Sequence, residues 1–436
     1  MVIVNNILWC IAIIMLLISG IYYSFKLNFL HLNFKKMFQS LKNNQFTNDG
    51  ISALESLSIS LGACIGVGSL AGIALAIYKG GIGTIFWILI SCLFIVPNSI
   101  VENTLAIIYR KREKNNYLGG PAHYIKDGLG YKKLSLVYAI LIVIAYLFGF
   151  LTIQSNTISK LFENFFRISP LLIGVIVGSI TFFIILKGVK GIAKFSSFFV
   201  PFMSCIYIII SLFIFIKNIN LIPEIIKNIV ATAFNFKSFG YGVFSAMIIG
   251  IQRGIFASEA GCGTVAIASG SSNIKKPIKQ GLISALGVYF TVFVICASTA
   301  FIILTSNYSE INYIDVNGIE ITNNALFYHL GNFGSATLYF CLIAFSFSTI
   351  VSGYYYIESN IKFIFKNISE KFILLLKVFT CLVLLIATII SPTFIWNISD
   401  ILVALLTIIN IFAIFSLRND VIREYVSERK NNYDRK

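Results

Sequence analysis

The 436-residue chain is 57% hydrophobic and 12% charged, and its mean hydropathy is +0.86. Because soluble domains carry roughly 25% charged residues, this composition excludes an ordinary soluble protein and predicts a polytopic protein of the lipid bilayer. The formal net charge of +16 does not predict nucleic-acid binding, since the lysines and arginines concentrate in loops between apolar segments. The eight cysteines lie in apolar segments without a Cys-x-x-Cys pair, which argues against a zinc site or a disulfide framework.

Apolar segments of about the length of a membrane span predict eleven transmembrane helices. We expect them at about 7–25, 54–78, 83–109, 135–160, 169–187, 194–216, 239–270, 280–305, 335–360, 371–390 and 394–417. The first segment lacks the basic start and the cleavage site of a signal peptide, so it is predicted to be retained as a span.

Two of these segments carry glycines where a spanning helix should be continuous. Residues 60–74 hold four glycines, and residues 250–263 hold four more together with Arg253 and Glu259. A glycine costs about 1 kcal/mol relative to alanine inside a helix. Either close packing through small residues or a break in the helix would explain the first stretch. The second stretch favours breaks, because paired glycine-interrupted helices in two halves indicate the binding site of an inverted-repeat transporter.

The predicted domain organisation follows from the positions of the two breaks. Residues 1–53 form an extra N-terminal helix and a basic loop, 54–238 and 239–417 form two repeats of five spans, and 418–436 form a polar tail. An odd number of spans per repeat inverts the second repeat relative to the first. The predicted fold is therefore all-α, with a five-plus-five inverted repeat, two discontinuous helices and one extra helix.

The distribution of basic residues predicts the orientation in the membrane. Alternate loops, beginning with 26–50 and ending with the tail, hold 26 of the 34 lysines and arginines, whereas the other loops hold six. By the positive-inside rule the first set is cytoplasmic. We therefore expect a cell-membrane protein with its N-terminus outside and its C-terminus in the cytoplasm.

The two breaks predict a site for a zwitterion. A broken helix leaves unpaired N–H groups at one new end, which suit a carboxylate, and unpaired C=O groups at the other, which suit an ammonium group or Na⁺. The predicted substrate-binding residues are Gly66, Gly68, Ser69, Gln154, Phe256, Ser258, Glu259, Gly261, Cys262 and Gly263.

Several of these residues have a structural alternative. Gln154 could form a hydrogen bond between helices instead of reaching the substrate. Glu259 could anchor the break or couple a cation, or it could form a fixed ion pair with Arg253, which is itself expected to be a gate or a helix-end anchor. Four acidic residues near predicted span ends are expected to have paired surface roles: Glu55, Glu102, Glu358 and Asp400.

A sodium site is predicted beside the first break. Ser348 and Thr349 are adjacent hydroxyls midway along 335–360, and with backbone carbonyls they would form an oxygen cage for a small cation. The predicted ligands are Gly62, Ile65, Phe345, Ser348 and Thr349. The alternative is that the two hydroxyls bond back to their own helix.

The chain resembles the alanine/glycine:cation symporter family, of the amino acid–polyamine–organocation type, along almost its whole length. The motifs that carry the resemblance are Gly-x-Gly-x-Leu-Ala-Gly-Ile-Ala at 66–74, Gly-Gly-Ile-Gly-Thr-Ile-Phe-Trp at 80–87, Glu-Asn-Thr-Leu-Ala at 102–106, Gly-Gly-Pro at 119–121, Gln-Ser-Asn at 154–156, Pro-Phe-Met at 201–203, Arg-Gly-Ile-Phe-Ala-Ser-Glu-Ala-Gly-Cys-Gly at 253–263, Lys-Gln-Gly at 279–281, Phe-Ser-Thr at 347–349 and Tyr-Tyr-Tyr at 354–356. The resemblance implies a sodium-coupled importer of small neutral amino acids such as alanine and glycine.

The chain departs from the family pattern at four places. Ser69 and Ser258 stand where the family usually has asparagine, Cys262 stands where a bulky residue is usual, and an Asp-Thr pair aligns with Thr291 and Val292. These departures bear on ion stoichiometry and on recognition of the substrate carboxylate, and a smaller Cys262 could widen the side-chain pocket.

The predicted function is secondary active symport by alternating access, with Na⁺ as the coupling ion, no other cofactor and a monomeric chain. One alternative is a proton-coupled or broader-specificity amino-acid transporter, and a second is a sensor or channel on the same fold. An enzyme is not expected, because the chain has no His-Glu-x-x-His or Gly-x-Ser-x-Gly motif.

Overall fold

The computed structural model describes residues 2–42, 47, 49–113, 116–234, 242–307, 318–365 and 367–433. Within the described residues, a helix or a run of consecutive helices overlaps each of the eleven predicted spans. These are α1 (Val2–Lys26), α3 (Ala53–Cys64) with η2 (Gly68–Gly72) and α4 (Ile73–Gly80), α5 (Thr84–Ile108), α7 (Lys132–Ala145) with η3 (Tyr146–Phe150) and α8 (Leu151–Phe166), α9 (Pro170–Ile185), α10 (Gly188–Lys217), α12 (Gly242–Ser258) with α13 (Thr264–Gly270), α14 (Pro277–Tyr289) with η6 (Phe290–Cys296) and α15 (Ala297–Leu304), α17 (Asn332–Ile364), α18 (Glu370–Ala387) and α19 (Pro392–Ser416).

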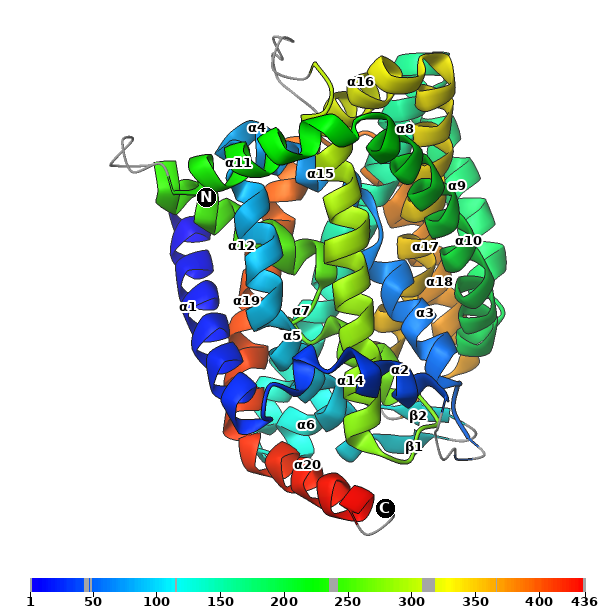
Figure 1. The fold of residues 1–436 in the computed structure, drawn as a ribbon. Coiled ribbons are helices and arrows are strands. Elements are labelled where there is room, and N and C mark those ends of the chain that lie inside the picture. Colours follow the sequence, from blue (N-terminus) through cyan, green and yellow to red (C-terminus); the bar gives the residue numbers. More distant parts are fainter. Residues whose placement is uncertain are drawn as a thin grey trace.

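Shorter elements that the apolar pattern does not predict lie at the two ends of the bundle (Figure 1). α11 (Ile222–Ala233) and α16 (Gly318–Leu330) lie at the end that holds the N-terminus. The opposite end holds α2 (Phe34–Lys42), α6 (Pro121–Asp127), α20 (Arg418–Tyr433) and an antiparallel hairpin of β1 (Lys111–Glu113) and β2 (Asn116–Leu118). Two 3₁₀ turns, η1 (Leu30–Leu32) and η4 (Ile219–Leu221), complete the described elements.

The all-helical, multi-pass class is confirmed. In the described ranges, seven helices are long and apolar enough to cross a membrane, and an eighth span results if α3 and the 68–80 helix count as one bent span. α9 is a shorter apolar helix of 16 residues. Of the loop lysines behind the predicted orientation, Lys114, Lys237 and Lys366 lie outside the described residues.

Helix starts follow familiar local rules. Ser52 and Glu55 form a capping box at α3, in which each side chain accepts a hydrogen bond from the other residue's backbone N–H. This contact confirms a paired structural role for Glu55. Several other helices begin with proline at a first position, where its missing N–H is not needed: Pro121, Pro170, Pro277 and Pro392.

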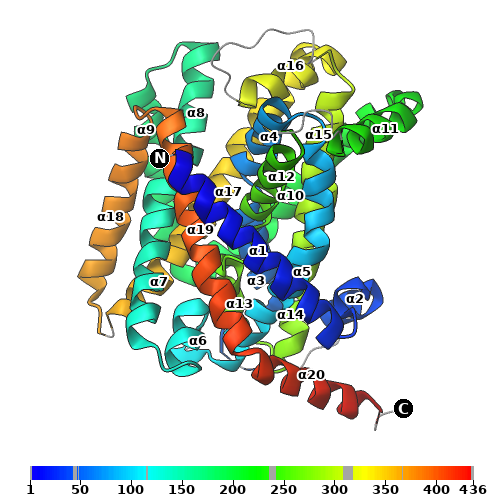
Figure 2. The same ribbon diagram turned by 90° about the vertical axis from the view of Figure 1, so that its left-hand side faces the viewer.

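The interrupted helices meet in the middle of the bundle. α3 packs against α10, α13 and α17, and η2 packs against α12. The helices that follow the two interruptions, α5 and α14, pack along each other, and α1 lies outside them against α5 and α19 (Figure 2). Sequence segments about two hundred residues apart therefore build one central region, as the two-break arrangement requires.

Main-chain hydrogen bonds join the two interrupted helices at the end of the bundle near α20. Just before α3, Ile51 pairs in parallel with the segment that follows α13: its N–H donates to Ser271 (3.0 Å), and its C=O accepts from Asn273 (2.7 Å). The N–H of Thr47 also donates to the C=O of Asn273, at 2.8 Å. We call this the 51/272 clasp.

Candidate functional site

The first break separates α3 from η2. The two helical parts meet at a bend of 53°. The N–H of Val67 donates to Oε1 of Gln154 at 3.1 Å, so Gln154 from α8 replaces the acceptor that a continuous helix would provide. A Cβ on Gly66 would lie 2.5 Å from Oγ1 of Thr349 and 3.0 Å from the Gln154 amide. Glycine is thus required at position 66 for α8 and α17 to approach the break.

The second break separates α12 from α13 and has a different backbone. Glu259, Gly261 and Gly263 all have positive φ, at 51°, 87° and 85°, a region that suits glycine and strains other residues. A Cβ on Gly263 would also lie 2.4 Å from Pro121 and 2.6 Å from the hydroxyl of Tyr138. The turn is therefore enclosed on both sides.

A buried carboxylate, Glu102 of α5, holds the second break. Its Oε1 accepts from the N–H of Gly261 at 3.2 Å, and its Oε2 accepts from Nδ2 of Asn410 at 2.7 Å. Nδ2 of Asn410 also donates to the C=O of Gly261 at 2.9 Å, and the hydroxyl of Tyr124 donates to Oδ1 of Asn410. The prediction of a surface role for Glu102 is wrong, because its side chain is fully buried and satisfies a broken helix.

Sequence reasoning missed Asn410, although it is a polar residue inside the apolar segment 394–417. An asparagine in the middle of an apolar segment indicates a polar partner, because a polar side chain at membrane depth needs one. What the sequence does not supply is the identity of that partner, which lies on α5.

Glu259 lies inside the second break and is 1% exposed. Its Oε2 accepts hydrogen bonds from the hydroxyl of Tyr146 and, at 2.8 Å, from Oγ1 of Thr264. Sγ of Cys262 donates to the C=O of Glu259 at 2.7 Å. Within the described residues, Oε1 of Glu259 has no hydrogen-bond partner.

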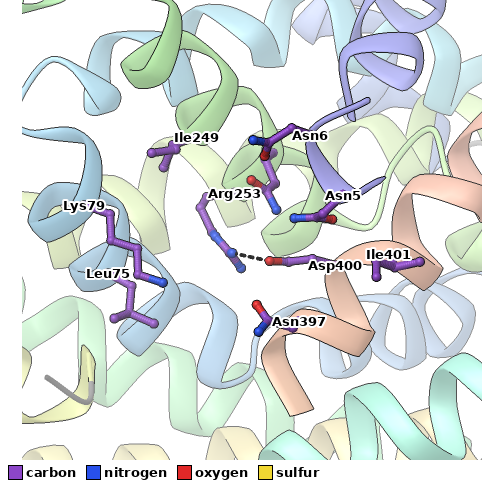
Figure 3. Close-up of a pocket in the computed structure, with 10 residues that line it drawn as sticks. Asn5, Asn6, Leu75, Lys79, Ile249, Arg253, Asn397, Asp400 and Ile401 are labelled. Atoms are coloured by element: carbon purple, nitrogen blue, oxygen red, sulfur yellow. Dashed lines mark hydrogen bonds and ion pairs between the residues drawn. The ribbon is translucent and has the colours of Figure 1, made fainter. Parts of the chain in front are cut away.

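The predicted alternative of an ion pair between Glu259 and Arg253 is wrong. Nη2 of Arg253 lies 2.7 Å from Oδ2 of Asp400 on α19 (Figure 3). The surface role predicted for Asp400 is wrong as well, since Asp400 is 5% exposed. The pairing predicted for Glu358 is confirmed, because its carboxylate lies 2.7 Å from Nζ of Lys362, one helical turn away, whereas its predicted surface position is wrong, since Glu358 is 8% exposed.

The two breaks contact each other directly. Sγ of Cys64, at the end of α3, donates to the C=O of Ser258, at the end of α12, at 3.1 Å. The hydroxyl of Ser258 donates to the C=O of Gly254 in its own helix, at 2.8 Å. The hydroxyl of Ser69 lies 3.5 Å from the C=O of Cys64, across the first break. The structure therefore brings the residues predicted from both breaks into one region.

An aromatic layer covers the first break. The rings of Phe150 and Phe256 stack with centroids 5.1 Å apart, and Phe256 lies 5.2 Å from the ring of Trp396. A Cβ on Gly68 would lie 3.1 Å from the Phe256 ring. The guanidinium of Arg253 lies 5.0 Å from the Trp396 ring, so the layer separates the breaks from the Arg253–Asp400 ion pair.

Oxygen atoms gather where α17 passes the end of α3. Oγ1 of Thr349 lies 3.0 Å from the C=O of Gly62, 3.2 Å from that of Ala63 and 3.1 Å from that of Phe345. Oγ of Ser348 lies 3.2 Å from the C=O of Gly62 and 2.9 Å from that of Phe345. These uncharged hard oxygens are the donor set that suits Na⁺.

The alternative prediction is confirmed, since both hydroxyls bond to the C=O of Phe345 in their own helix. They also bond to C=O groups of α3, and their role as sodium ligands stays a prediction. Ala63 enters the cluster although the sequence did not single it out. Ile65 is placed at the C-cap of α3 with its N–H donating to Leu61, and its role as an ion ligand stays a prediction.

α6 supports the second break from the end of the bundle near α20. Pro121, its first residue, packs against Gly263. Burial lowers the pKa of His123 in the same helix to about 4, so this imidazole is neutral at pH 7.

An apolar bundle whose two interrupted helices meet at its centre is the architecture of a membrane transporter. The solved structure of MhsT in complex with L-phenylalanine has the same fold, with a TM-score of 0.62 and 14% identity over 84% of this chain and 89% of that one. The chain belongs to the sodium:alanine symporter family, whose model matches residues 1–436.

Two relatives from Bacillus subtilis (strain 168) illustrate the family. The chain is 33% identical to the amino-acid carrier protein AlsT, over 99% of this chain and 92% of that protein. It is 35% identical to the probable sodium/glutamine symporter GlnT, over 99% of this chain and 91% of that protein. The chain is therefore a membrane transporter and not an enzyme.

Proposed function

We propose that this protein imports a small neutral amino acid, alanine or glycine, together with Na⁺ by alternating access. The observation that carries the proposal is the meeting of the two breaks beside an oxygen cluster. The proposal includes eleven spans arranged as an extra helix plus two inverted repeats of five, with the boundaries predicted from the sequence. The bundle end near α11 then faces outside and the end near α20 faces the cytoplasm, which accounts for the excess of basic residues there.

The substrate carboxylate binds at the first break in this mechanism. η2 begins at Gly68, and the partial positive charge at the start of a helix stabilises an anion. Two carboxyl groups already lie just before the corresponding start of α13: Glu102 accepts from the N–H of Gly261, and Glu259 accepts from the hydroxyl of Thr264, so they disfavour a second carboxylate there. The first break is thus the available carboxylate site, with Gly66, Gly68 and Ser69 at its edge.

The substrate ammonium group binds at the second break. The C=O groups at the end of α12 carry the partial negative charge of a helix C-terminus, and Ser258 presents one of them toward Cys64 of the first break. Phe256 lies above the substrate as a lid, and Gln154 keeps the first break open by holding Val67. Cys262 and Gly263 complete the wall of the site.

Na⁺ binds in the oxygen cluster of Gly62, Phe345, Ser348 and Thr349 and so ties α3 to α17. Because Gly62 lies directly before the first break, an ion there orders the same segment that receives the substrate. This arrangement couples the two binding events: each ligand finds its site better formed when the other is present.

One observation favours proton coupling as a second candidate. Glu259 is buried and its Oε1 has no hydrogen-bond partner within the described residues, so a proton on this atom would have to find an acceptor in the substrate or in water. A proton-driven carrier would use Glu259 as its coupling group.

Uptake of radiolabelled alanine into proteoliposomes tests the proposal. An inward Na⁺ gradient should drive saturable accumulation, and an equal K⁺ gradient should not. Accumulation with a proton gradient alone would transfer the coupling to H⁺, and Glu259→Gln should then abolish it. Binding that depends on Na⁺ without accumulation would indicate a sensor, and conduction without saturation would indicate a channel.

A further inference from the structure

A second polar cavity lies above the aromatic layer, where α1, α4, α12 and α19 approach one another (Figure 3). It has a volume of about 260 Å³, and four helices supply its polar lining: Asn5 and Asn6 from α1, Lys79 from α4, Gln252 and Arg253 from α12, and Asn397 and Asp400 from α19. Ligand pockets start at about 300 Å³, so this cavity suits only a small molecule. It is distinct from the breaks, which lie beyond Phe256 and Trp396.

The ion pair in this cavity is incompletely satisfied. Arg253 and Asp400 are 8% and 5% exposed, and one contact of 2.7 Å joins Nη2 to Oδ2. Within the described residues, Nη1 of Arg253 and Oδ1 of Asp400 have no hydrogen-bond partner. Buried charged groups left in this state are costly, and a molecule that brings one acceptor and one donor would satisfy both.

Lys79 adds a second cation to the cavity. It lies in the last turn of α4 with its side chain directed toward the cavity (Figure 3), and it forms no ion pair among the residues that the structure describes. Lys79, Arg253 and Asp400 together give the lining one net positive charge, which a carboxylate would neutralise. The asparagine amides contribute neutral donors and acceptors around the three charges.

We propose that this cavity is an outer binding site for the same amino-acid zwitterion, occupied before the substrate reaches the breaks. The substrate carboxylate faces Arg253 and Lys79, and the ammonium group faces Asp400. Asn5 and Asn6 make the extra helix α1 a part of the site. The inference depends on the proposed function for the identity of the substrate and for the side from which it arrives.

The test counts bound alanine in the full-length protein, purified and reconstituted in lipid nanodiscs with saturating NaCl. Equilibrium binding of radiolabelled L-alanine should give two molecules per chain. Asn6→Trp, which fills the cavity from the exposed face of α1, should give one molecule with the remaining affinity unchanged. Lys79→Gln should weaken binding at the outer site only, by about tenfold for the loss of one charged contact.

Matched controls separate this site from general electrostatic attraction. Lys227→Gln removes an exposed lysine from α11 at the same end of the bundle and should leave two molecules bound. Propionate, which lacks the ammonium group, should not displace the second alanine. Displacement by propionate as effective as by alanine would overturn the zwitterion assignment in favour of a simple anion site.

The outcomes for the outer site and for transport are distinguishable. One bound molecule in the unmodified chain, or two in Asn6→Trp, would overturn the outer site while Na⁺-driven uptake still supports the proposed function. Two bound molecules without Na⁺-driven uptake would support the outer site and overturn symport. The absence of any bound alanine would overturn the assignment of alanine to both sites.

Discussion

The two helix breaks are built in opposite ways. The first break is held by uncharged contacts from neighbouring helices, chiefly the amide of Gln154 and the hydroxyl of Thr349. The second break has three residues with positive φ, and the buried carboxyl group of Glu102 holds its backbone at Gly261. A backbone held by buried hydrogen bonds is costly to rearrange, so the second break is a fixed frame against which the first break can respond to ligands.

The largest expected effect comes from removing Glu102, the buried side chain that holds the second break. Glu102→Ala leaves two buried donors unpaired, on Gly261 and on Asn410, at about 1–3 kcal/mol each. We expect a clearly lower midpoint of thermal unfolding in detergent. Glu163→Ala is the matched control, because its side chain is 39% exposed and pairs with Lys160, and such exposed pairs contribute about 0–1 kcal/mol. Equal losses in the two variants would contradict the difference between the breaks.

A glycine series tests the space at the first break. The added Cβ would lie 2.5 Å from its nearest neighbour at Gly66, 3.1 Å at Gly68 and 3.7 Å at Gly72. Na⁺-driven alanine uptake should be abolished in Gly66→Ala, reduced in Gly68→Ala and nearly unchanged in Gly72→Ala, while all three proteins remain monodisperse. Full activity of Gly66→Ala would show that the approach of Thr349 and Gln154 is not needed for transport.

The oxygen cluster gives a more moderate effect. Thr349→Ala removes one candidate ligand, so the Na⁺ concentration for half-maximal uptake should rise about tenfold for a loss of ~1.4 kcal/mol. Thr337→Ala on the same helix removes a hydroxyl that donates only to the C=O of Phe333, and it should leave the Na⁺ dependence unchanged. Similar behaviour of both variants would dissociate the cluster from ion coupling.

The smallest effect concerns pH and the support of the second break. Burial lowers the pKa of His123 to about 4 in the folded protein, against about 6.5 when the chain is unfolded. Between these values the unfolded chain binds the extra proton, so stability present at pH 7 is lost as the pH falls toward 4. The thermal midpoint of His123→Phe should depend less on pH from 7 to 5 than that of the unmodified chain. An identical pH profile would exclude this contribution.

The sequence was sufficient for the helices and for the breaks. Apolar length located the helices, seven or eight of which are long and apolar enough to cross a membrane in the described ranges. Glycine clusters located both interruptions. Both signals are local. It was insufficient for the partners of buried polar residues. An ion pair between Arg253 and Glu259, six positions apart, is the pairing that the sequence suggests. The structure pairs Arg253 instead with Asp400, 147 positions away. Glu102 and Asn410 are separated by 308 positions, and only helix packing brings them together.

The 51/272 clasp limits how the bundle end near α20 can open. If α3 swung away alone, the three main-chain hydrogen bonds of the clasp would break, at a net cost of about 0.5–1.5 kcal/mol each. If α3 and α13 moved as one body, these bonds would survive. The clasp therefore favours a movement in which α3 and α13 turn together relative to α12, whose last residue Ser258 is in contact with Cys64 of α3.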